Sequence, residues 1–151
     1  MNYTLDTNML LYIFRDDKFK SKIEETFQFK SSSNKLIISI VSVGEMRALS
    51  LKNQWGEKKK LALEEYLKGF IIISIDNDEI VNTYALIDAF SQNKIPNKPL
   101  KTTARNMGKN DIWIAATAAL TNSQLLTTDK DFTHLDNSFI DLQLIRASDW
   151  V

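Results

Sequence analysis

The sequence contains no cysteine, only one histidine, two prolines and four glycines among its 151 residues. Without cysteine the chain can form neither a disulfide nor a thiolate metal site, and it has no thiol nucleophile. The single histidine, His134, excludes any mechanism built on two histidines, and its turn-like context predicts an exposed side chain. No glycine-rich phosphate loop is present, so nothing supports a nucleotide triphosphatase.

Long hydrophobic runs are also missing. No apolar stretch approaches the roughly 20 residues that a membrane-spanning helix needs, and residues 1–6 lack the cationic and apolar regions of a signal peptide. Hydrophobic residues make up 44% and charged residues 25% of the chain, which is typical of a folded domain. We therefore expect one domain spanning residues 1–151, located in the cytoplasm and without a membrane partner.

Neither sign of charge is in excess, because 19 basic residues balance 19 acidic ones. This balance counts mildly against a nucleic-acid partner, since such proteins often carry a basic excess. The charges are unevenly distributed, however. Segment 89–110 contains no acidic residue and five basic ones: Lys94, Lys98, Lys101, Arg105 and Lys109. On charge alone, a solvated loop is the simpler interpretation of this segment.

Short apolar runs alternate with longer amphipathic segments along the chain. Strands are expected at 3–5, 36–39, 70–75, 124–127 and 142–145, helices at 7–14, 19–29, 41–52, 57–68, 78–90 and 111–120, and a loop at 93–103. This order predicts an α/β fold with a parallel sheet flanked by helices. Because the strands are continuously apolar, both sheet faces should be covered. Ligands of such sheets bind beyond the carboxyl ends of the strands, at a switch in strand order.

Two acidic residues follow strands. Asp6 comes directly after the first strand, and Asp129 comes after the strand at 124–127. Either could serve only its local turn, since aspartate often caps a helix or forms an Asx turn. Asp6 also precedes an apolar run, so its carboxylate should be partly buried, and a buried charge requires a partner such as a cation. Asp131 competes with Asp129 for any role.

Two further acids lie at the beginnings of helices. Glu45 has the spacing of a capping box with Ser42, but if the helix begins earlier, near Ser39, Glu45 faces inward and reaches the same sheet edge as Asp6. Asp111 heads a helix face whose next positions are small and apolar. It should therefore point into the protein, although a helix cap or the helix dipole would also explain an acid there.

The agreement among these four positions is stronger evidence than any one of them. Clustered carboxylates repel one another unless a cation lies among them. Oxygen ligands without cysteine or histidine suit Mg²⁺ or Mn²⁺ rather than zinc or copper. The sequence therefore predicts a Mg²⁺ site, with Mn²⁺ as the alternative, formed by Asp6, Glu45, Asp111 and Asp129.

Four segments together resemble PIN-domain ribonucleases, specifically the toxins of VapBC-type toxin–antitoxin pairs. They are Leu5-Asp6-Thr7-Asn8, Ser42 to Glu45, Asn110 to Ala116, and Leu126 to Phe132. The resemblance covers essentially the whole chain. It implies a three-layer α/β/α fold with a central parallel sheet of four to five strands. It further implies Mg²⁺- or Mn²⁺-dependent cleavage of RNA, a homodimer, and a cognate antitoxin that inhibits by occupying the active-site groove.

By the same resemblance, Asp6, Glu45 and Asp111 match the three best-conserved acids of the family, and Asp129 matches the more variable fourth. The polar side chains expected to support these acids are Thr7, Asn8, Thr127, Thr128 and Asp131. Arg105 and Lys109, just before Asp111, are expected to meet the RNA backbone, which would add affinity rather than sequence preference.

Three other functions are alternatives to this one. A phosphatase of the haloacid-dehalogenase type needs a second aspartate two residues after the first, where this chain has Asn8. A response-regulator receiver ends its third strand in an aspartate, as Asp76 does here, but also needs an acid pair after the first strand. A catalytically silent binding platform would be indicated by loss of an acid, and none of the four is missing.

Overall fold

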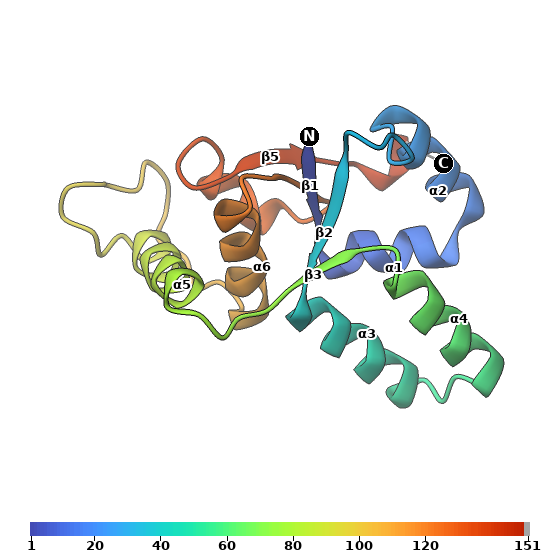
Figure 1. Ribbon diagram of the computed structural model, residues 1–151. Coiled ribbons are helices and arrows are strands. Elements are labelled where there is room, and N and C mark those ends of the chain that lie inside the picture. The colour runs from blue at the N-terminus through green and yellow to red at the C-terminus, as the bar shows by residue number, and fades with distance from the viewer. Residues whose placement is uncertain (150–151) are drawn as a thin grey trace.

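A computed structural model describes residues 1–149 of the protein and has at its centre a sheet of five parallel strands. The strands are β1 (Asn2–Leu5), β2 (Lys35–Ser39), β3 (Ile71–Ile73), β4 (Gln124–Thr127) and β5 (Asp141–Leu144). The helices are α1 (Thr7–Arg15), α2 (Asp17–Thr26), α3 (Ile40–Lys52), α4 (Glu57–Leu67), α5 (Asp78–Ser91) and α6 (Lys109–Leu120), with 3₁₀ helices η1 (Lys130–Leu135) and η2 (Ala147–Asp149) (Figure 1). The expected α/β fold with a parallel sheet is confirmed.

The strand order β3-β2-β1-β4-β5 contains one reversal of direction. From β1 the chain adds β2 and then β3 on one side, and it later returns to place β4 and then β5 on the other side of β1. Strand β1 is parallel to β4, with Leu5 opposite Leu126. The carboxyl ends of β1 and β4 therefore lie side by side at the switch point, where open α/β sheets hold their ligands.

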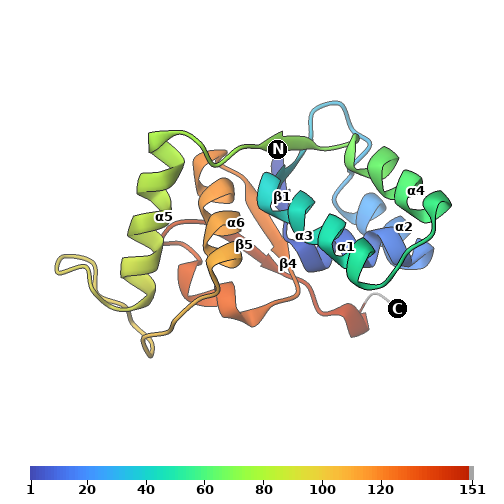
Figure 2. The same ribbon diagram turned by 90° about the horizontal axis from the view of Figure 1, so that it is seen from below.

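Two separate hydrophobic cores cover the two faces of the sheet. Helices α1 to α4 form one core with Leu5, Ile38 and Leu126, while α5, α6 and η1 form the other with Leu125. Neighbouring residues Leu125 and Leu126 belong to different cores because successive strand side chains point to opposite faces. Figure 2 shows α5 and α6 on one side of the strands and α1, α2 and α4 on the other. The expected three layers are present.

Strand β3 differs from the expectation that every strand is covered on both faces. It spans only Ile71–Ile73, shorter than the predicted 70–75, and pairs with β2 alone. The side chains of Ile71 and Ile72 remain 45% and 43% exposed. A continuous apolar run thus predicted the strand but could not tell an edge strand from a central one, because burial depends on neighbours that the run does not specify.

His134 is buried, so the expectation of an exposed turn residue was wrong. Its Nε2 lies 2.7 Å from Oγ of the buried Ser91, which joins η1 to the end of α5. The ring also stacks on Phe90. Burial, followed by the nearby charge of Arg105, lowers the pKa of His134. This histidine therefore supports the fold and lies away from the surface.

None of the helices among the described residues combines the length and the apolar character that crossing a lipid bilayer requires. Several of them begin at side-chain caps that the sequence supplies. Asp16 accepts hydrogen bonds from the backbone N–H groups of Lys18 and Phe19 at the start of α2, and Asn77 accepts one from Ile80 at the start of α5. Such caps satisfy backbone donors that the first helical turn leaves unpaired.

A pair of leucine truncations tests the core. Leu10 in α1 is fully buried, whereas Leu61 in α4 is 67% exposed. We expect Leu10→Ala to lower the free energy of unfolding by about 2–5 kcal/mol, since it removes buried methyl groups and leaves a cavity. Leu61→Ala should change it by less than about 0.5 kcal/mol. Urea denaturation followed by circular dichroism measures both, and equal effects would contradict the assigned packing.

Candidate functional site

Asp6 is the most buried of the four acids, with only 3% of its surface exposed. It follows β1 and caps α1, and its Oδ1 accepts a hydrogen bond of 2.8 Å from the backbone N–H of Met9. Its Oδ2 accepts a second bond from the hydroxyl of Thr127, at the end of β4. The cap and the inward-facing carboxylate, which the sequence left as alternatives, are thus both present in one side chain.

Glu45 faces the same region from α3. This helix begins at Ile40 with Ser39 as its cap, so the capping box between Ser42 and Glu45 does not form. Instead Thr7 Oγ1 lies 2.7 Å from Glu45 Oε1 and 3.0 Å from Ser42 Oγ. The Thr7 hydroxyl is the donor in both contacts, so its single hydrogen is shared between the Glu45 carboxylate and the Ser42 hydroxyl oxygen. The buried Ser42 therefore contacts the hydroxyl that orients Glu45, a role that its position in an apparent capping box had concealed.

Asp111 lies in the first turn of α6, which begins at Lys109 and is capped by Gly108 without a side-chain hydrogen bond. Asp111 is therefore not the cap of the helix. It is partly buried, and the small residues Ala115 and Ala118 behind it are fully buried against the sheet. The inward orientation expected from the sequence follows from this packing.

Asp129 and Asp131 differ in how closely they approach the other acids. Asp129 caps η1 by accepting the backbone N–H of Asp131, and its own N–H donates to Thr127 Oγ1 at 2.9 Å. The charge of Asp129 raises the pKa of both Asp6 and Asp111, whereas the charge of Asp131 contributes to the shift of Asp111 and not to that of Asp6. These contacts favour Asp129 as the fourth acid. Thr127 bonds the carboxylate of Asp6, and no hydrogen bond involves the Thr128 side chain within residues 1–149.

The electrostatics of the site show that the four carboxylates share one region. Burial, with added repulsion from Asp111 and Asp129, raises the pKa of Asp6 to about 6, against opposing hydrogen bonds from Thr127 and Met9. Burial also raises the pKa of Asp111 to about 6, followed by the charges of Asp129, Glu45 and Asp131. The neighbouring acids therefore make the ionised forms of Asp6 and Asp111 less favourable.

The donor chemistry fits a hard divalent cation. The candidate ligands are carboxylate and hydroxyl oxygens, and a cation would relieve the repulsion that adds to burial in raising the pKa of Asp6 and Asp111. The distances between the acids fit an ion less well than their chemistry does. Within residues 1–149, no three acidic side chains are close enough together to enclose an ion. The residues thus fit Mg²⁺ or Mn²⁺ by type and charge, in an arrangement that is open.

The predicted basic and amide residues around the acids differ in solvent exposure. Asn8 and Lys109 are exposed. Arg105 is only partly exposed, and its Nε is buried without a hydrogen-bond partner among the described residues. Arg105 lines a hollow of about 280 Å³ together with Asp131, so its side chain lies beside the acidic site.

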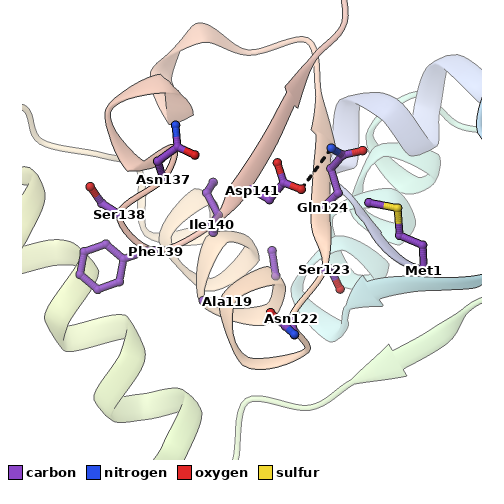
Figure 3. A pocket seen from close by; sticks show the side chains of 11 residues that line it. Met1, Ala119, Asn122, Ser123, Gln124, Asn137, Ser138, Phe139, Ile140 and Asp141 are labelled. Atoms are coloured by element: carbon purple, nitrogen blue, oxygen red, sulfur yellow. Dashed lines mark hydrogen bonds between the residues drawn. The ribbon is translucent and has the colours of Figure 1, made fainter.

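A second hollow, of about 330 Å³, lies at the opposite edge of the sheet. It is formed where β4 and β5 begin, and Figure 3 shows Gln124 and Asp141 within it, joined by a hydrogen bond of 3.2 Å. Only one acid lines this hollow. The amino ends of the strands therefore lack the converging carboxylates found at the carboxyl ends.

The PIN domain family model matches residues 3–138 of the chain. Among curated proteins, no sequence relative matches. Solved structures do match, and they share the fold with this chain at low sequence identity.

One is VapBC2 from Rickettsia felis bound to a DNA fragment from their promoter, with a TM-score of 0.73, 22% identity and coverage of 94% of this chain and 98% of that one. VapBC-1 from nontypeable Haemophilus influenzae matches with a TM-score of 0.70, 23% identity and coverage of 95% and 98%. FitAcB from Neisseria gonorrhoeae matches with a TM-score of 0.67, 23% identity and coverage of 93% and 95%.

The pKa of Asp6 generates a prediction for the metal-free protein. The folded-state pKa of about 6 exceeds the value of 3.8 for an unperturbed carboxyl. The protonated carboxyl therefore contributes stability that is fully present below about pH 4 and is lost as the pH rises through about 6, by up to about 3 kcal/mol. In EDTA, Asp6→Asn should flatten this decline and be the more stable protein at pH 7.5.

Urea denaturation between pH 4 and 8 measures the effect. Asp17→Asn, which alters an exposed acid in the first turn of α2, is the matched control and should keep the wild-type decline. The assignment fails if Asp6→Asn shows the wild-type slope and a lower free energy of unfolding at every pH.

Proposed function

Because the chain belongs to the PIN-domain family, we propose that it is a Mg²⁺-dependent endoribonuclease that acts as the toxin of a toxin–antitoxin pair. One observation carries the proposal: carboxylates from four different segments lie at the switch point of the sheet, where burial, with added repulsion from the neighbouring acids, raises the pKa of Asp6 and of Asp111. A dication would offset this repulsion, and RNA supplies a phosphate that such a cation binds. Mn²⁺ is the alternative ion.

In this proposal Asp6, Glu45, Asp111 and Asp129 hold the ion. When bound, the ion supplies acidity to a water molecule and compensates negative charge on the phosphate. Thr127 holds Asp6 in place through its hydroxyl, and Thr7 does the same for Glu45. Such supporting bonds limit the rotation of the two carboxylates.

The chain's own cations would bring RNA to this acidic region. Lys109 is exposed at the start of α6, two residues before Asp111, and Arg105 lies beside Asp131. Contacts between these side chains and phosphates would add affinity that weakens with salt, without selecting a sequence. The zero net charge of the chain is compatible with such local attraction.

The proposed partners follow from the resemblance and from the solved structures. Several of the matching structures are toxin–antitoxin complexes, which supports a cognate antitoxin for this chain as well. We also propose a homodimer. The open edge of β3, with Ile71 and Ile72 nearly half exposed, leaves apolar surface available for such contacts.

Induction of the chain in a bacterial host tests the function directly. We expect growth arrest and discrete RNA fragments on a gel, both abolished by Asp6→Asn and by Asp111→Asn because the ion loses a ligand. Asp141→Asn is the control, since this acid lies at the opposite edge of the sheet. Purified protein should cleave the same RNA in Mg²⁺ and stop in EDTA.

A milder substitution tests the supporting shell. Thr7→Val keeps the volume of the side chain and removes its hydrogen bond to Glu45, so cleavage should fall about 10- to 100-fold. If folded wild-type protein leaves RNA intact, the nuclease proposal is wrong and a silent binding platform becomes the better explanation. If Asp6→Asn cleaves as well as wild type, the assignment of the active site to these acids is wrong.

A further inference from the structure

A groove of about 570 Å³ runs between α1 and α3 and opens onto the acidic site. We call it the α1–α3 groove. Helix α3 packs alongside α1, as Figure 2 shows. Thr7, Glu45 and Asn110 line the end of the groove nearest the acids. The remaining lining residues are Asn8, Leu11, Val41, Gly44, Ala48, Leu49 and Lys52.

The walls of the groove are apolar, and its floor is open. Leu11, Val41 and Leu49 are each only partly buried and expose aliphatic surface to the groove. Gly44 is exposed, and a Cβ placed on it would meet no atom within 4 Å. A larger residue at this position would therefore fill the groove without disturbing the packing of α3.

Three polar side chains at the groove are free to bind something else. Within residues 1–149, the side chains of Asn8, Asn110 and Lys52 take part in no hydrogen bond or ion pair. Asn8 and Asn110 are near the acidic end, where their amides offer both donors and acceptors. Lys52 lies two turns further along α3 than Glu45, a separation of about 10 Å along the helix axis.

We propose that the α1–α3 groove binds the nucleotide adjacent to the scissile phosphate and so sets the sequence preference of cleavage. Its base lies against Leu11, Val41 and Leu49, the amides of Asn8 and Asn110 face the base edge, and Lys52 binds the next phosphate. The inference rests on the proposed ribonuclease function, which does not itself assign a base-binding site.

Three features favour a nucleotide over a protein segment as the occupant. The groove spans only about two helical turns, which suits a single nucleotide. The positive charge of Lys52 at one end is complementary to a phosphate, and at the other end a phosphate would bind the acids through the proposed cation. Paired amides beside an apolar wall also match how proteins read an unstacked base, by surface contact and by hydrogen bonds to its edges.

Binding of single nucleotides tests the groove without relying on cleavage. The four ribonucleoside 5′-monophosphates are titrated with Mg²⁺ into protein carrying labelled methyl groups. We expect NMR shifts of the Leu11, Val41 and Leu49 methyls, with one nucleotide binding more tightly than the others. The methyls of the exposed Leu61 are the internal control. Gly44→Leu should abolish the groove shifts.

Cleavage of a randomised RNA pool, followed by sequencing of the ends, tests the role in specificity. Gly44→Leu should lower kcat/KM about tenfold or more by excluding the base. The control Gly56→Leu places the same side chain at a glycine that also has open space but caps α4. Asn8→Ala should weaken the base preference at one position beside the cut, whereas Asn82→Ala on α5 should keep it.

The outcomes separate this inference from the proposed function. If Gly44→Leu cleaves RNA with the rate and base preference of the wild type, and no groove methyl shifts when nucleotides are added, the groove assignment is wrong. The nuclease proposal would then still stand. Methyl shifts without any RNA cleavage by wild type would support nucleotide binding and overturn the nuclease. If Gly44→Leu cleaves normally but loses inhibition by a partner protein, the groove binds protein and the inference is wrong.

Discussion

The structure depends on the buried carboxylate of Asp6, which is hydrogen-bonded both to the first turn of α1 and to the end of β4. One oxygen accepts from Met9 in α1 and the other from Thr127 at the end of β4. The same threonine accepts from the backbone of Asp129. Because the reversal of strand order makes β1 and β4 neighbours, the bond from Thr127 to Asp6 joins residues 121 positions apart, at the edge where ligands of such sheets bind.

This arrangement places stability and chemistry in opposition. A carboxylate that is only 3% exposed and lies near other acids is held against its own desolvation and their repulsion. The fold tolerates it because two cores, one on each face of the sheet, surround the edge at which it lies. Proteins accept such local instability at functional sites. A bound cation would make the electrostatic energy of the carboxylate favourable instead of unfavourable.

Helix α3 shows how one element can contribute to both parts of the proposed site. Glu45 is oriented toward the acids by Thr7 and Ser42, while Gly44 and Ala48 on the same helix leave the α1–α3 groove open. Glycine within a helix lowers stability by about 1 kcal/mol relative to alanine, so this position is the weak point of α3. In exchange, the absence of a side chain at Gly44 leaves open space that forms part of the α1–α3 groove.

The sequence by itself determined the alternation of strands and helices, the parallel sheet and the four acids at strand ends and helix starts, since these follow from local periodicity and residue chemistry. It could not decide whether Glu45 caps its helix or faces Asp6, because that depends on a helix start one turn earlier. It also misjudged His134 and β3. Whether a side chain is buried depends on contacts between distant segments, and only the tertiary structure fixes these contacts. His134 is buried against Ser91, whereas within residues 1–149 no strand lies beyond β3 to cover it.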